Sequence, residues 1–177
     1  MAYELYLLPV PEGAEIEETG EALLARLDGL RAEPRPPSAV AGTQRLAELL
    51  VAAEPGLEPW CAPPAEEAAE TGSSVPVVEL RDPSGLQLTL ARRFARVLVP
   101  VAYDGEAARE VFERAFRLLG LASRETGWQV YDPQEAAPVE LSDAGCRETL
   151  EVFLTVMDQL RQGRRRGGRA APGGRPA

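Results

Sequence analysis

The chain has 177 residues, about the length of one domain, and its apolar and charged contents are ordinary for a globular protein. It contains no His and no Lys, so every one of its 19 cations is Arg. These absences exclude a Ser-His-Asp triad, a Cys-His pair, a Schiff-base lysine and a phosphate-binding P-loop lysine, and two cysteines alone cannot form a Cys-rich zinc site.

Charge is divided unevenly along the chain. The first 160 residues hold all 28 acids, whereas residues 161–177 hold six Arg and no acid, and the net charge is −9. An acidic body repels nucleic acid over most of its surface. No basic, apolar leader and no run of about 20 apolar residues is present, so we expect a cytoplasmic protein without a membrane span.

In the first third of the chain, residues 3–8 predict a strand and residues 15–31 an amphipathic helix. A second helix is expected to begin at Thr43, which is a good N-cap. Residues 54–74 are rich in Pro and Glu and predict a long irregular loop, which Trp60 is expected to attach to the body.

The middle of the chain, residues 75–103, has the alternation typical of β-structure. Asp82-Pro83-Ser84-Gly85 is a type I turn sequence and predicts a hairpin, and a further strand follows it. Asp104 is a good N-cap for an amphipathic helix with Phe112 and Phe116 on its apolar side, expected to close near Gly120.

Residues 127–134 predict one more strand, and a last helix is expected from Ser142 or Asp143 to Gly163. The predicted order is β-α-α-β-β-β-α-β-α. This is an α+β chain with a largely antiparallel sheet of about five strands and helices mainly on one face, in the simplest layout a ferredoxin-like core with additions. We expect one domain over residues 1–162 and a disordered Arg/Gly/Pro tail over residues 163–177.

The string Gly127-Trp128-Gln129-Val130-Tyr131-Asp132-Pro133-Gln134 concentrates aromatic and amide side chains in a chain otherwise poor in both. One interpretation is structural: Trp128 and Val130 face the core, Tyr131 faces the opposite way, and Asp132-Pro133 ends the strand. The other is functional: Trp128, Tyr131, Asp132 and Gln134, with Trp60 behind them, bind a partner, because Trp and Tyr carry much of the energy of interfaces.

The same string, together with the Ala2-Tyr3-x-Leu5-Tyr6 start and the helix from residue 104, resembles a group of small bacterial proteins without an assigned activity. Some of those proteins resemble toxin-neutralising immunity proteins. The resemblance implies a bacterial binding protein and transfers no catalytic residue or cofactor. We therefore expect a non-catalytic protein, without a cofactor, that binds a protein partner, and the acidic body suits a basic one.

Two alternatives stay open. Asp82, Asp104 and Asp132 each follow a predicted strand and could hold Mg²⁺ in a metal-dependent hydrolase if those strand ends meet. Each also has a local explanation, as a turn residue, an N-cap and a pre-proline residue, respectively. Arg164-Arg165-Arg166 could make a weak nucleic-acid adaptor of the tail, with salt-sensitive binding.

Overall fold

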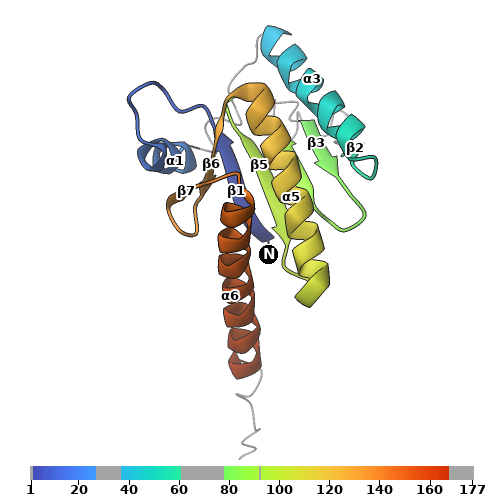
Figure 1. Cartoon of the computed structure of the whole chain (residues 1–177), viewed down its shortest axis with the longest axis vertical. Helices are drawn as coiled ribbons and strands as arrows, with labels where there is room; N and C mark the ends of the chain where they lie inside the picture. The colour runs from blue at the N-terminus through green and yellow to red at the C-terminus, as the bar shows by residue number, and fades with distance from the viewer. Residues whose placement is uncertain (1, 27–36, 61–77, 92, 168–177) are drawn as a thin grey trace, which may run out of the picture.

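The computed structural model describes residues 2–26, 37–60, 78–91 and 93–167, and Figure 1 shows the arrangement of their helices and strands. The strands are β1 (Ala2–Leu8), β2 (Glu58–Trp60), β3 (Val78–Arg81), β4 (Gln87–Leu90), β5 (Ala95–Pro100), β6 (Gln129–Asp132) and β7 (Ala137–Val139). The helices are α1 (Ile16–Leu24), α3 (Pro37–Ala53), α5 (Gly105–Thr126) and α6 (Asp143–Gly167). No helix in these four ranges has the length and apolar character needed to cross a membrane.

The strands form one antiparallel sheet in the order β2-β3-β4-β5-β1-β6-β7. The α+β class and the antiparallel sheet are confirmed, and the predicted hairpin closes through the Gly85 amide, which donates to the Asp82 carbonyl at 3.0 Å. The predicted number of strands and the predicted element order are wrong, because the sheet has seven strands.

The two strands that the sequence did not reveal lie at the two edges of the sheet. Strand β2 falls inside the segment predicted as irregular, and β7 follows the strand predicted at the Trp128 motif. Each has three residues with a proline in the middle, Pro59 in β2 and Pro138 in β7. Three residues are too few to show alternation, and proline is tolerated only where one side of the strand needs no hydrogen bond, which is the situation of an edge.

The four central strands are joined by two crossovers. Strand β1 is antiparallel to both of its neighbours, so β5 and β6 run parallel on either side of it and α5 connects them. Strand β4 runs parallel to β1 with β5 between them, and the chain passes through α1, α3, β2 and β3 on its way from β1 to β4. The result is two interleaved strand-helix-strand units.

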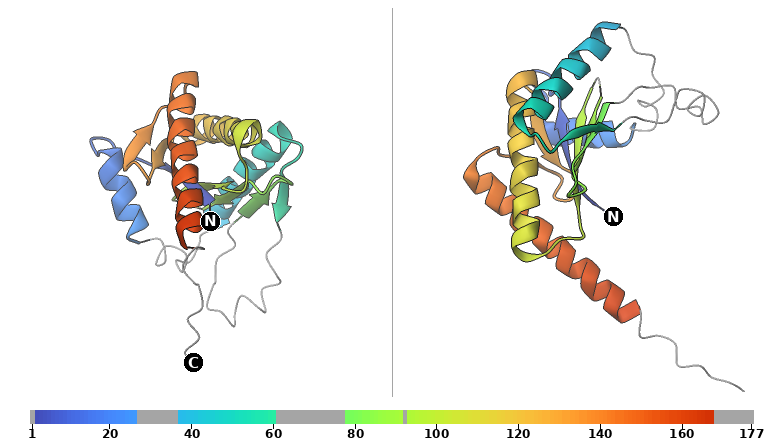
Figure 2. Two further views of the ribbon diagram at one scale, coloured as in Figure 1. Left: turned by 90° about the horizontal axis from the view of Figure 1, so that it is seen from below. Right: turned by 90° about the vertical axis from the view of Figure 1, so that its right-hand side faces the viewer.

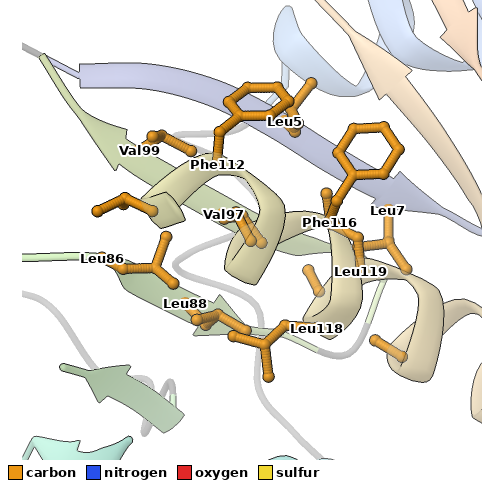
Figure 3. Packing of buried hydrophobic residues seen from close by; sticks show 14 of the residues in the cluster. Leu5, Leu7, Leu86, Leu88, Val97, Val99, Phe112, Phe116, Leu118 and Leu119 are labelled. Atoms are coloured by element: carbon orange, nitrogen blue, oxygen red, sulfur yellow. The ribbon is translucent and has the colours of Figure 1, made fainter. Parts of the chain in front are cut away.

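One face of the sheet carries the main core. Figure 3 shows Phe112, Phe116 and Leu119 of α5 lying over alternate residues of β1, β4 and β5. Helices α3 and α6 extend this layer with buried side chains from their own apolar stripes, Leu46 and Leu50 on α3 and Leu150, Phe153 and Met157 on α6. The predicted α5 stripe is confirmed, and it fixes which face of the sheet the three helices cover.

The opposite face carries a smaller cluster under α1. Its buried members are Tyr6, Leu8, Ile16, Ala91, Phe94 and Tyr131. Helix α1 packs on β1, β6 and β7, and the right-hand view of Figure 2 shows it on the other side of the sheet from α3 and α5. Both faces of the β1–β6 region are therefore buried.

Several helix boundaries differ from expectation. Helix α3 begins at Pro37, a favoured first helical residue, so Thr43 lies inside the helix and is not its N-cap. Helix α5 continues past Gly120 to a left-handed cap at Gly127, because Leu119 and Ala122 on either side of Gly120 are buried. Helix α6 continues past Gly163 to Gly167, since Arg is a good helix former and one glycine costs only about 1 kcal/mol. Residues 27–31 of the first predicted helix and residues 168–177 lie outside the described residues.

Candidate functional site

The Trp128 motif forms β6 and the turn of the β6–β7 hairpin. Val130 pairs with Val139 and Asp132 with Ala137, so residues 133–136 make a four-residue connection. Ala136 closes it in the left-handed conformation, with φ 51°. This hairpin forms the edge of the sheet beside α1 (Figure 1), and β6 contacts β1, α1 and α5.

Tyr131 holds helix α1 against the hairpin. Its side chain is 1% exposed and lies in the smaller cluster. A Cβ at Gly20 would lie 2.5 Å from the Tyr131 ring, so only glycine lets α1 approach this closely. Burial, with the charges of Glu21 and Glu17 as further causes, raises the pKa of Tyr131. The sequence placed Tyr131 opposite to Trp128 and Val130, which is confirmed, but that face is covered by α1.

Asp132 points into the main core, where it is 2% exposed. Its Oδ2 accepts a hydrogen bond from the Tyr3 hydroxyl, and its Oδ1 accepts one from the backbone N–H of Gln134 at 2.8 Å. The Tyr3 ring packs edge-on against Phe153 with centroids 5.4 Å apart. Burial raises the pKa of Asp132, and the hydrogen bond from Tyr3 opposes that rise. Burial and the bond to Asp132 also raise the pKa of Tyr3.

The Gln134 side chain links the β6–β7 turn to β1. With its amide oriented to satisfy its neighbours, Nε2 donates to the Glu4 carbonyl at 3.0 Å and to Asp132 Oδ1 at 3.1 Å. On the far side of the hairpin, Gly145 at the start of α6 packs on the backbone of Glu140, where any Cβ would collide with the carbonyl oxygen. Ser142 caps the same helix by accepting from the Gly145 amide at 3.1 Å. The hairpin is thus fixed between α1, β1 and α6.

The surface built on this frame is acidic. Residues 1–25 contain six acids and no Arg, and residues 125–146 contain five acids and no Arg. The fold brings these two segments together, since α1 packs on β6 and β7. We call the partly or fully exposed acids at this place the acidic edge: Glu12, Glu15, Glu17, Glu18, Glu21, Glu135 and Glu140. None of them forms an ion pair with another residue that the structure describes. The sequence analysis missed this surface, and the two Arg-free stretches are the signal that could have pointed to it.

The two tryptophans lie far apart. Trp128 is half-buried against the main core, and its backbone is held by Ser123 Oγ, which donates to its carbonyl at 2.6 Å. Trp60 is 42% exposed on β2, at the opposite edge of the sheet from the hairpin, with the Arg81 guanidinium 4.0 Å from its ring centroid. The structure therefore brings Trp128, Tyr131, Asp132 and Gln134 together on β6 and its turn, and leaves Trp60 apart.

The three aspartates of the metal alternative have separate environments. Asp82 accepts from Arg114 Nη1 at 2.6 Å, Asp104 is the N-cap residue of α5, and Asp132 bonds to Tyr3. Within the part of the chain that the structure describes, no group of three His, Cys, Asp or Glu residues is arranged to hold a metal ion. Cys146 is half-buried near the start of α6, where burial raises the pKa of its thiol.

Comparison of the chain with protein-family models, with curated proteins and with solved structures found no match in any of the three.

Proposed function

We propose that this chain is a non-catalytic bacterial protein of the cytoplasm that binds a basic protein partner through the acidic edge, as an immunity or inhibitor protein does. Complementary charge accelerates encounter and selects partners of the opposite sign. The observation that carries the proposal is the meeting of two Arg-free segments, residues 1–25 and 125–146, on one rigid frame.

The rigidity of that frame supports the proposal. A partner gains most from charges that are already ordered, because less conformational freedom is lost on binding. Helix α1 is fixed by Gly20 on Tyr131, and the hairpin turn is fixed by Asp132 on Tyr3. In this proposal the buried Tyr131 and Asp132 support the binding surface, whereas the exposed Gln134 and the half-buried Trp128 contact the partner.

We also propose that the central part of the fold is a ferredoxin-like core. Strands β6, β1, β5 and β4 are adjacent in that order, and with α3 and α5 they follow the chain as strand, helix, two strands, helix and strand. Strands β2, β3 and β7 and helices α1 and α6 are then additions to this core. The acids of the acidic edge lie on α1 and in the segment before it, and in the loops on either side of β7.

Two triple variants of equal net charge test the proposed function. The first, Glu17→Gln with Glu21→Gln and Glu135→Gln, neutralises the acidic edge. The matched control, Glu110→Gln with Glu148→Gln and Glu151→Gln, removes exposed acids from α5 and α6. A fluorescent deca-arginine peptide is titrated into each by anisotropy at several salt concentrations.

We expect the first variant to weaken binding about tenfold and to lower its salt dependence, since ordered charges close to one another act together. The control should change binding by less than about threefold. Equal losses in both variants would mean that only net charge matters, and the acidic edge would then not be the binding surface.

A further inference from the structure

A cavity of about 380 Å³ lies beside Trp128, away from the hairpin turn. Its walls come from the middle of α3, the facing ends of β4 and β5, and the end of α5. The space exists because three of its lining residues are small, namely Gly42, Ala91 and Ala95. This volume lies within the range of sites that hold a small molecule or one inserted side chain.

Three features of the cavity suit a positive charge. Trp128 supplies an indole ring, the aromatic group that attracts cations most strongly. Glu125 supplies a carboxylate that is 36% exposed. The cavity also lies at the C-terminal end of α5, which carries the negative end of the helix dipole.

The chain already places a guanidinium at this cavity. Arg45 Nη2 lies 3.6 Å from Glu125 Oε1, and the Arg45 side chain is 79% exposed. A pair this loose and this exposed contributes little to stability, so a competing cation can displace Arg45 at small cost.

We propose that this cavity binds the guanidinium of an arginine side chain, which lies against Trp128 and pairs with Glu125 in place of Arg45. The proposal rests on the proposed function, because such an arginine would belong to the basic partner. The cavity and the acidic edge would then bind one partner at two places joined by β6.

The test uses a ligand too small to reach the acidic edge. N-acetyl-arginine amide is titrated into full-length Trp60→Phe protein, so that Trp128 is the only indole, and its fluorescence is followed. The matched control ligand is N-acetyl-citrulline amide, which has nearly the same shape but no charge. We expect the arginine ligand to perturb Trp128 fluorescence saturably and the citrulline ligand to bind at least about tenfold more weakly.

Two substitutions at the rim should act in opposite directions. Glu125→Gln removes the carboxylate and should weaken arginine binding about tenfold. Arg45→Gln removes the internal competitor and should strengthen binding severalfold. A site for anions would show the reverse signs, and equal binding of the two ligands would also overturn the proposal.

A third variant fills the cavity. A Cβ at Gly42 would meet no atom within 4 Å, so Gly42→Leu is expected to fold and to occupy the space. We expect it to abolish the Trp128 response while leaving deca-arginine binding at the acidic edge within about threefold. If the acidic-edge triple variant bound deca-arginine as well as its control did, while the Trp128 response stayed intact, the proposed function would be wrong. The cavity would then remain as a separate cation site. Unchanged Trp128 quenching in a folded Gly42→Leu protein would overturn the cavity proposal alone.

Discussion

Asp82 and Asp132 are two buried aspartates that share an Asp-Pro sequence but have different tertiary partners. Asp82 follows the last residue of β3, and Asp132 is the last residue of β6. Each precedes a proline, and its Oδ1 accepts a hydrogen bond from the backbone of its own turn, from Leu86 N at 3.0 Å and from Gln134 N at 2.8 Å, respectively. The second oxygen differs. In Asp82 it faces the Arg114 guanidinium, and in Asp132 it faces the neutral hydroxyl of Tyr3.

The difference shows that one turn motif can be used in two ways. At Asp82 the carboxylate joins the β3–β4 turn to α5 through a charge, and Arg114 also reaches Glu54 at 3.5 Å. At Asp132 the carboxyl joins β6 to β1 without a described cation, in a setting where burial raises its pKa. The first aspartate needs its positive partner, whereas the second would be held more easily as a neutral group.

Removal of Arg114 should have the largest effect. Arg114→Met leaves the Asp82 side chain, which is 0% exposed, without its cation, and stranding a buried charge costs about 3 kcal/mol. Arg117→Met on the same helix is the control, because Arg117 is 65% exposed and pairs only loosely with Glu54. Urea unfolding measures both variants, and equal losses would show that Asp82 does not depend on Arg114.

Removal of the Tyr3 hydroxyl should come next. Tyr3→Phe keeps the ring on Phe112 and Phe153 but leaves Asp132 Oδ2 without its donor, at a cost of about 2 kcal/mol. In an Asp132→Asn background the same change should cost less, and the double-mutant cycle gives the coupling between the two groups. Zero coupling would mean that this hydrogen bond does not stabilise the hairpin.

The turns also differ in the residue that adopts positive φ. Gly85 has φ 82° in the first, whereas Ala136 has φ 51° in the second. Ala136→Gly should raise the free energy of unfolding by about 0.5–1 kcal/mol, because an L-residue in this region is strained. Gly85→Ala should lower it by about 1 kcal/mol. Thermal unfolding measures both variants. If only the entropy of the unfolded chain mattered, Ala136→Gly would destabilise the protein and Gly85→Ala would stabilise it, which is the reverse of the expected result.

Asp132→Asn should have the smallest effect at neutral pH, where we expect its free energy of unfolding to stay within about 1 kcal/mol of the native value. The Asn side-chain oxygen can still accept the hydrogen bond from the Gln134 backbone N–H. Its pH dependence is more informative. A carboxyl whose folded pKa is raised stabilises the fold fully below its unfolded pKa, and this contribution is lost as pH rises through the folded pKa. The native chain should therefore lose stability relative to Asp132→Asn as pH rises from below about 3.8.

Urea unfolding of both proteins between about pH 3 and pH 8 follows this trend. The opposite trend, in which the native chain gains on Asp132→Asn as pH rises, would mean a lowered pKa. The hydrogen bonds from Tyr3 and the Gln134 backbone would then outweigh burial, Asp132 would be held as a carboxylate, and the contrast between the two aspartates would disappear.

Local patterns in the sequence were sufficient for part of this structure. The α5 stripe around Phe112, the Asp82–Gly85 turn and the assignment of Val130 and Tyr131 to opposite faces are all as predicted. These features depend on the 3.6-residue and two-residue periods and on turn chemistry, which act within a few residues. The edge strands were missed because their pairing depends on which strand the fold brings beside them.

The candidate site shows the same division. The sequence by itself determined that the Tyr131-Asp132-Pro133 segment ends a strand, and that Tyr131 faces away from Trp128. Only the tertiary structure decided that this other face is covered, because Gly20 of α1 lies 111 positions away in the chain from the Tyr131 ring that it contacts. Tyr3 and Asp132 are 129 positions apart, and no local pattern pairs residues at that separation. Alternation tells which side chains share a face, but what covers that face is fixed by packing across the whole chain.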